Sequence, residues 1–232
     1  STQAVWLGQS TPTFSNGQFD ATNLRVYGAK GTLAELVVTA KGAQSVSLTK
    51  NFTVDKDPIV GDPSFSGGTI VGVLSSPISS VAGITAGGRI IEAAPLDLYG
   101  VAGIYPANFM GAMRNGPISV TTSVSPGTGA ANTKSILDFQ ARFGVASAIP
   151  VVANAVIRGL DDWFLPSKGD LTNIDSALAA ANAYRPWLTS NNSYLTSSIS
   201  GSGLNVWALG RTNFWPPPLE TAFNLYPIRV FG

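Results

Sequence analysis

The most informative segment of the sequence is Gly159-Leu160-Asp161-Asp162-Trp163-Phe164-Leu165-Pro166-Ser167-Lys168-Gly169-Asp170-Leu171. Ser167 precedes Asp170 by three residues, which is a short-armed variant of the capping box that starts a helix. Apolar residues then recur at helical spacing, namely Leu171, Ile174, Leu178 and Ala181. The segment therefore predicts a turn rich in large apolar side chains, followed by an amphipathic helix.

Two more helices are predicted upstream of this one. Thr133 is suited to cap a helix that begins at Lys134 and stops at Gly144. Its apolar face would be formed by residues three or four apart: Ile136, Phe139 and Phe143. A second helix is expected to start near Pro150, because proline is tolerated in the first turn, and to end before Gly159.

Short β-rich runs occur on both sides of these helices. The runs in the main part of the chain predict strands at 69–74, 89–94, 194–196, 205–209 and 228–231. The first 57 residues contain four more runs, at 24–27, 35–38, 45–48 and 52–54. Two Asp-Pro steps, Asp57-Pro58 and Asp62-Pro63, disfavour both a helix and a central strand. We therefore expect an α+β chain with a small antiparallel β module at 1–57, a linker at 58–66 and a main domain at 67–232.

Segment 159–171 resembles the hallmark of the Lcl C-terminal-like family of C-type-lectin-fold domains, which runs approximately G-Y-D-D-W-F-L-P-S-K-D-E-L. Four other segments follow in the family's order: 91–97 is similar to L-I-A-A-P-E-D, 127–133 to G-T-G-x-x-N-T, 194–198 to Y-W-S-S-S and 227–231 to P-V-R-A-F. The chain departs from the pattern at Gly169 and Asp170, which stand in place of an acidic pair, and at Leu195, which stands in place of a tryptophan.

The resemblance implies a C-type-lectin-like domain with long surface loops, in a family found in bacterial surface proteins and in phage virion proteins. It does not imply one shared ligand. The chain lacks the Glu-Pro-Asn and Trp-Asn-Asp signatures of calcium-dependent sugar-binding lectins, and Trp207-Ala208-Leu209 stands in the expected strand. We therefore expect no calcium site, no other metal site and no cofactor.

Six residues of segment 159–171 are interpreted as anchors of the fold: Asp162, Trp163, Leu165, Pro166, Ser167 and Asp170. Trp163 is expected to fill the core, while Asp161 or Asp162 accepts a backbone hydrogen bond in the turn. A glycosidase would instead need two carboxyl groups facing each other across a substrate, about 5–9 Å apart. Adjacent residues rarely provide that geometry, so we expect no enzymatic activity.

The composition excludes several kinds of chemistry and partner. The chain contains no cysteine and no histidine, which excludes thiol nucleophiles, disulfides, Cys/His zinc sites and Ser-His-Asp triads. Ser197, Ser198 and Ser200 are therefore interpreted as hydrogen-bonding residues at a strand end. The net charge is +1 and the basic residues are scattered, so no nucleic-acid partner is expected. No window approaches the roughly 18 apolar residues of a membrane-spanning helix, so no membrane insertion is expected.

Two loops have the composition of a recognition surface. They contain the candidate ligand-binding residues Trp187, Asn191, Asn192, Arg211, Asn213, Phe214 and Trp215. Aromatic side chains offer rigid contact area, and Asn side chains offer adaptable hydrogen bonds. The alternative is that Phe214 and Trp215 only fill the base of a loop or a contact between subunits.

These observations together predict a non-enzymatic structural protein of a phage particle, either a capsid-decorating protein or a tail or fibre component. Only 12% of the residues are charged, whereas about 25% is typical, which suits a surface buried against other subunits. The expected partners are other virion proteins, copies of the same chain and a host surface glycan or protein. The start at Ser1, with no basic and apolar leader, favours synthesis in the host cytoplasm. The alternative is a lectin or adhesin on a bacterial cell surface.

Overall fold

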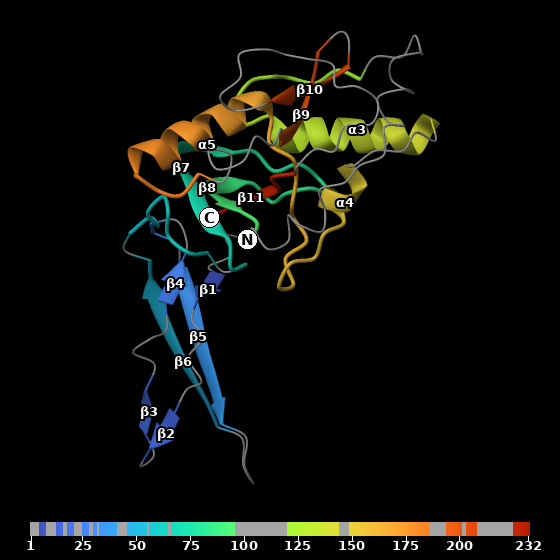
Figure 1. The fold of residues 1–232 in the computed structure, drawn as a ribbon. Helices are drawn as coiled ribbons and strands as arrows, with labels where there is room; N and C mark the ends of the chain where they lie inside the picture. The colour runs from blue at the N-terminus through green and yellow to red at the C-terminus, as the bar shows by residue number, and fades with distance from the viewer. Residues whose placement is uncertain are drawn as a thin grey trace.

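The chain is a mixed α+β fold that contains a small open antiparallel sheet, as the sequence predicted for the fold class. The computed structural model describes residues 5–7, 13–15, 18–20, 25–27, 30–31, 33–40, 46–54, 56–64, 66–95, 120–143, 149–185, 194–200, 203–207 and 225–232. Figure 1 shows helices on one side of this sheet and a long β-hairpin extending away from it.

The central sheet has three strands in the order β11-β8-β7. They are β7 (Thr69–Ile78), β8 (Gly88–Ala93) and β11 (Ile228–Phe231). Both pairings are antiparallel. The central strand β8 pairs with β7 on one side and, on the other side, with β11 from the far end of the chain. The prediction for 228–231 is confirmed. Strand β7 continues four residues beyond the predicted end at Leu74, and β8 is shifted by one residue from its predicted range.

Gly88 allows the start of β8 to lie very close to the end of β11. Its φ is 150°, and a Cβ added there would lie 2.3 Å from the carbonyl carbon of Phe231. Only glycine lets β8 begin this close to β11. Next to Gly88, the backbone N–H of Arg89 donates to the carbonyl of Gly232 at 3.1 Å, which extends the pairing of the two strands.

Three helices lie in the described part of the chain: α3 (Gly129–Phe143), α4 (Ile149–Ala153) and α5 (Lys168–Ala180). The predicted start of α3 at Lys134 is wrong, because the helix begins four residues before Thr133. The predicted extent of α4 is also wrong, since the helix ends at Ala153 and residues 157 and 160 form an isolated bridge. The start of α5 is confirmed, and Leu171, Ile174 and Leu178 are buried as predicted, whereas Ala181 is exposed.

The helices contribute to two of the three clusters of buried apolar side chains in the described residues. In the first, the buried side chains of α5 pack with Val71, Ile91 and Val230 of the sheet. In the second, Trp163 and Leu165 pack with residues from three other elements, namely Ile136, Ile149, Val152 and Leu195. Figure 1 shows both α3 and α5 above the sheet. Segment 159–171 therefore lies between these two clusters, because Phe164 belongs to the first and Trp163 to the second.

A second hairpin is formed by β9 (Tyr194–Ser200) and β10 (Gly203–Trp207), which pair antiparallel with one bulge. Strand β9 is longer than the predicted 194–196. Strand β10 begins two residues before the predicted 205–209, and residues 208 and 209 lie outside the described residues. Residues Tyr194 to Ser198 are all buried, so this strand is part of the core.

The described residues between 5 and 53 form antiparallel pairs of strands. The pairs are β1 (Val5–Leu7) with β4 (Arg25–Tyr27), β2 (Thr13–Ser15) with β3 (Gln18–Asp20), and β5 (Leu33–Ala40) with β6 (Val46–Thr53). The prediction of separate strands at 45–48 and 52–54 is wrong, because both ranges fall largely within β6. The strands β1, β2 and β3 were not predicted.

The segment predicted as a linker, 58–66, is bonded to the sheet over much of its length. Gly61 N–H donates to Ile70 O, and Ile70 N–H donates to Asp62 O, both at 2.8 Å. Ser64 N–H donates to Gly68 O at 3.0 Å. These bonds place residues 61–64 beside β7. The division of the chain near residue 57 stays a prediction.

Candidate functional site

Segment 159–171 is attached to the C-terminal strand through its backbone. Phe164 and Ile228 exchange two backbone hydrogen bonds, each of 2.9 Å. Trp163, which has no exposed surface, donates its indole N–H to the carbonyl of Leu160 at 3.0 Å. Leu165 N–H donates to the hydroxyl of Thr133 at 3.2 Å. The turn is therefore fixed to β11 on one side and to α3 on the other.

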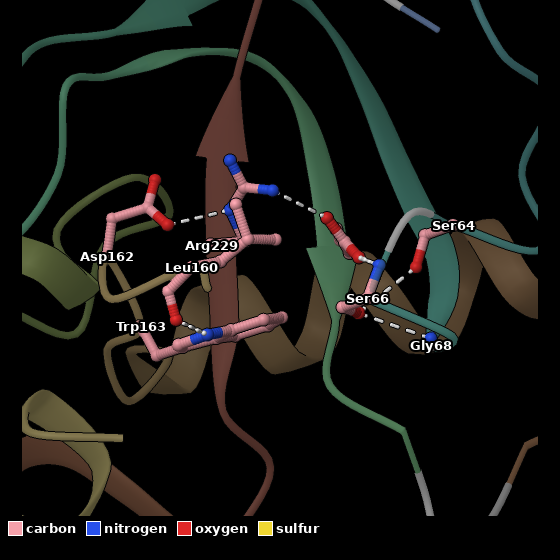
Figure 2. Close-up of polar contacts among 8 residues, drawn as sticks. Ser64, Ser66, Gly68, Leu160, Asp162, Trp163 and Arg229 are labelled. Carbon is pink, nitrogen blue, oxygen red and sulfur yellow. Dashed lines mark hydrogen bonds and ion pairs between the residues drawn. The ribbon is translucent and has the colours of Figure 1, made fainter. Parts of the chain in front are cut away.

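Asp162 forms an ion pair with a buried arginine. Its Oδ1 accepts from Nε of Arg229 at 2.8 Å, while Nη1 of Arg229 donates to Oε2 of Glu92 at 3.0 Å. Arg229 is 2% exposed and Glu92 is completely buried. Figure 2 shows the Arg229 guanidinium group beside the Asp162 carboxylate and above the Trp163 ring. The expectation that the aspartate of this turn bonds the backbone is wrong for Asp162, which bonds a side chain instead.

Glu92 is bonded through both of its carboxylate oxygens. Its Oε1 accepts from the N–H of Ser66 at 3.1 Å, on the side away from Arg229. The Ser66 hydroxyl in turn lies 3.3 Å from the Ser64 hydroxyl and accepts from Gly68 N–H at 3.2 Å (Figure 2). A buried charge is tolerated only when it is paired and hydrogen-bonded, and this network meets that condition.

Arg229 also contacts two aromatic rings. Its Cζ lies 5.9 Å from the ring centroid of Trp163 and 4.9 Å from that of Phe231. Both distances fall within the roughly 6 Å over which a cation is attracted to a ring face. Neither Arg229 nor Glu92 was among the predicted anchors. They could have been found from the sequence, because each is a charged residue with apolar neighbours on both sides in a predicted strand, and such a charge needs a partner.

Asp170 caps two helices at the same time. Its carboxylate accepts from Ser167 N–H at 2.8 Å, and Ser167 Oγ accepts from Asp170 N–H at 3.1 Å, so the predicted capping box of α5 is present. The same carboxylate accepts from Gly127 N–H at 2.5 Å and from Gly129 N–H at 3.1 Å, at the start of α3. This explains why α3 begins at Gly129. The sequence showed only the local partner of Asp170 and not the distant one.

Burial raises the pKa of the Asp170 carboxyl above its ordinary value of 3.8. Hydrogen bonds from the backbone of Gly127, Ser167 and Gly129, and from the Ser167 hydroxyl, act in the opposite direction. Burial favours the neutral form of a carboxyl, whereas donors aimed at its oxygens favour the charged form.

Two glycines allow the close contacts around Asp170. A Cβ at Gly129 would lie 2.7 Å from Asp170 Oδ2. A Cβ at Gly169 would lie 2.5 Å from the backbone nitrogen of Pro126 and 2.6 Å from the carbonyl oxygen of Val124. Glycine at position 169 thus has a physical reason, because residues 124–126 pack directly on this turn and leave no room for a side chain.

The serines of β9 connect this turn to the neighbouring segment. Ser198 Oγ accepts from Lys168 N–H at 3.0 Å and donates to the carbonyl of Ser123 at 2.9 Å. Ser197 N–H donates to the carbonyl of Pro166 at 2.9 Å. Both serines are hydrogen-bonding residues as predicted, but they lie in the middle of β9 rather than at its end. Their burial and backbone partners suit a structural role.

The predicted ligand-binding residues Trp187, Asn191, Asn192, Arg211, Asn213, Phe214 and Trp215 all lie outside the described residues. The last described residues before the first of these two loops are Tyr184 and Arg185. Tyr184 is 60% exposed, and Arg185 Nη1 pairs with Asp175 Oδ1 at 3.1 Å. This pair ties the residue before the first predicted loop to α5.

The chemistry available in the described residues is limited. Within the described ranges, no three His, Cys, Asp or Glu side chains gather in a way that could hold a metal ion. None of the described helices has the length and apolar character needed to cross a membrane. Comparisons of the chain with protein-family models, with curated proteins and with solved structures find no significant match.

Proposed function

We propose that this protein is a non-enzymatic structural protein of a phage particle, in which residues 67–232 form a C-type-lectin-like domain. The observation that carries the proposal is that the carboxylates of Asp162 and Asp170 in segment 159–171 are bonded to other parts of the chain. Asp162 pairs with Arg229, and Asp170 accepts three backbone hydrogen bonds. Side chains committed in this way hold the chain together and are not arranged to act on a substrate.

The architecture is also in line with the resemblance noted in the sequence. The resembling segments 91–97 and 227–231 contribute to the paired strands β8 and β11, and segment 127–133 contributes to α3. Segments that are far apart in the sequence thus meet around one turn. Such a scaffold leaves its loops free to vary, which suits a domain that recognises a surface or another subunit.

Mass spectrometry of purified particles tests this proposal. The chain should be present at a constant number of copies per particle after density-gradient purification and high-salt washing. Its location on the capsid, tail or fibre would follow from immunogold labelling. If intact particles encoded by the same genome lack the chain, the virion proposal is wrong.

The second candidate is a bacterial surface adhesin that binds glycans. Exposed Tyr184, next to the first predicted binding loop, favours it, because an exposed aromatic ring offers rigid contact area. Selective signals on a glycan array that are lost in both Tyr184→Ala and Trp215→Ala would support this candidate. Tyr194→Phe is a suitable control, because Tyr194 is a buried core residue.

A further inference from the structure

Asp57 lies between the long β5–β6 hairpin and the three-stranded sheet, and its carboxylate contacts both. Oδ1 accepts from the backbone N–H of Lys30 at 2.8 Å. Oδ2 lies 3.4 Å from Nη2 of Arg89, in β8. The two oxygens of one side chain therefore connect two structural units.

The Lys30 end of this connection is part of the hairpin base. Gly31 N–H donates to Val54 O at 2.9 Å, just beyond the last ladder pair of β5 and β6, which is Leu33 with Thr53. Lys30 thus lies at the base of the hairpin, next to the last paired residues of β5 and β6. Fixing its N–H fixes the hairpin base.

The Arg89 end of the connection is held by the sheet. Arg89 Nε donates to Leu74 O at 2.9 Å, and its backbone N–H donates to Gly232 O at 3.1 Å. The guanidinium group therefore points toward Asp57 from a position set by β7 and by the residue that follows β11.

We propose that Asp57 is a latch that sets the angle between the β5–β6 hairpin and the sheet. The stronger part of the latch is the bond from Lys30 N–H, because it is shorter, at 2.8 Å against 3.4 Å for the Arg89 pair, and its acceptor is charged. The Arg89 pair is the weaker part, because its side chains are 32% and 27% exposed and exposed ion pairs contribute little. Without the carboxylate, the bonds from Asp57 to Lys30 and Arg89 are lost, and the angle between the hairpin and the sheet is no longer fixed by them. This inference concerns the geometry of the chain and does not depend on the proposed function.

A fixed angle matters for any partner that binds both units. A surface that is already in its bound arrangement loses less conformational freedom on binding. The latch would then let the hairpin and the sheet act as one rigid contact surface.

The absence of cysteine makes the latch directly measurable. Cysteines introduced at exposed Asn51, in β6, and exposed Ala179, in α5, can carry two spin labels in the full chain. Pulsed electron spin resonance then gives the distribution of distances between the labels. We expect Asp57→Ala to broaden this distribution relative to the parent protein, while circular dichroism stays unchanged.

Asp62→Ala is the matched control. Asp62 also precedes a proline, but its Oδ2 accepts from Ile59 N–H at 3.2 Å, within its own turn. Asp62→Ala should leave the distribution as narrow as in the parent. The latch is refuted if Asp57→Ala gives the parent distribution, or if Asp62→Ala broadens it equally.

Discussion

Replacement of Arg229 by methionine removes the guanidinium group and keeps much of the apolar stem. Glu92 then remains in a site with no exposed surface, bonded to Ser66 N–H and no longer paired with a positive charge. Asp162 is affected less, because its side chain is 23% exposed and can be solvated by water. The stability loss should therefore come mainly from Glu92.

The size of the effect follows from the burial of the pair. Removing one partner of a buried ion pair costs about 3–5 kcal/mol. For a domain of this size, 1 kcal/mol shifts the melting temperature by about 2–4 °C, so Arg229→Met should lower it by roughly 6–20 °C. Adding Glu92→Gln should recover a large part of the loss, since it removes the unpaired charge and keeps an acceptor for Ser66 N–H.

Urea denaturation followed by tryptophan fluorescence measures these differences, and Arg89→Met is the matched control. Arg89 also pairs with an aspartate, but the pair is about one-third exposed, so the loss of the pair should cost at most about 1 kcal/mol, and the loss of the bond from Arg89 Nε to Leu74 O about 1 kcal/mol more. The reasoning fails if Arg229→Met costs no more than Arg89→Met. It also fails if the double variant with Glu92→Gln is no more stable than Arg229→Met alone.

Three further predictions concern the neighbouring contacts. Gly169→Ala should destabilise the protein in urea denaturation, because its Cβ would meet the backbone at Val124 and Pro126; unchanged stability would show that this segment moves easily. Burial raises the pKa of Asp170, so the contribution of this carboxyl to stability should be fully present below pH 3.8 and should fall as the pH rises through the raised pKa. Urea midpoints measured against pH should show this fall in the parent protein and not in Asp170→Asn. Gln140 is buried, and its amide atoms have no hydrogen-bond partner among the described residues, so Gln140→Met should raise the unfolding free energy by about 1–3 kcal/mol, and a loss of stability would contradict this.

The sequence predicted those parts of the fold that depend on local patterns. Ser167 and Asp170 are close in sequence, so the start of α5 was visible as a capping box. Strand β11 was visible as a short apolar run. The hairpin of β2 and β3 was missed, although the two residues between them are Asn16 and Gly17, a pair typical of two-residue hairpin loops.

The contacts that the sequence did not predict depend on partners far along the chain. The start of α3 at Gly129 is set by Asp170, which lies 41 residues later. The partner of Asp162 is Arg229, which lies 67 residues later. Hydrophobic periodicity carries no information about pairs so far apart in the sequence. A single charge within an apolar strand indicates that a partner exists, but it does not say which residue supplies it.

The order β11-β8-β7 has a consequence for how the protein is made. Glu92 and Arg229 are 137 residues apart in the chain. At a translation rate of about 5–20 residues per second, the ribosome needs roughly 7–27 s to reach the arginine after the glutamate. During that time β8 has no β11 beside it, and a chain terminated early never obtains one. Nascent or truncated chains would expose this strand edge, which makes them natural substrates for chaperones and proteases.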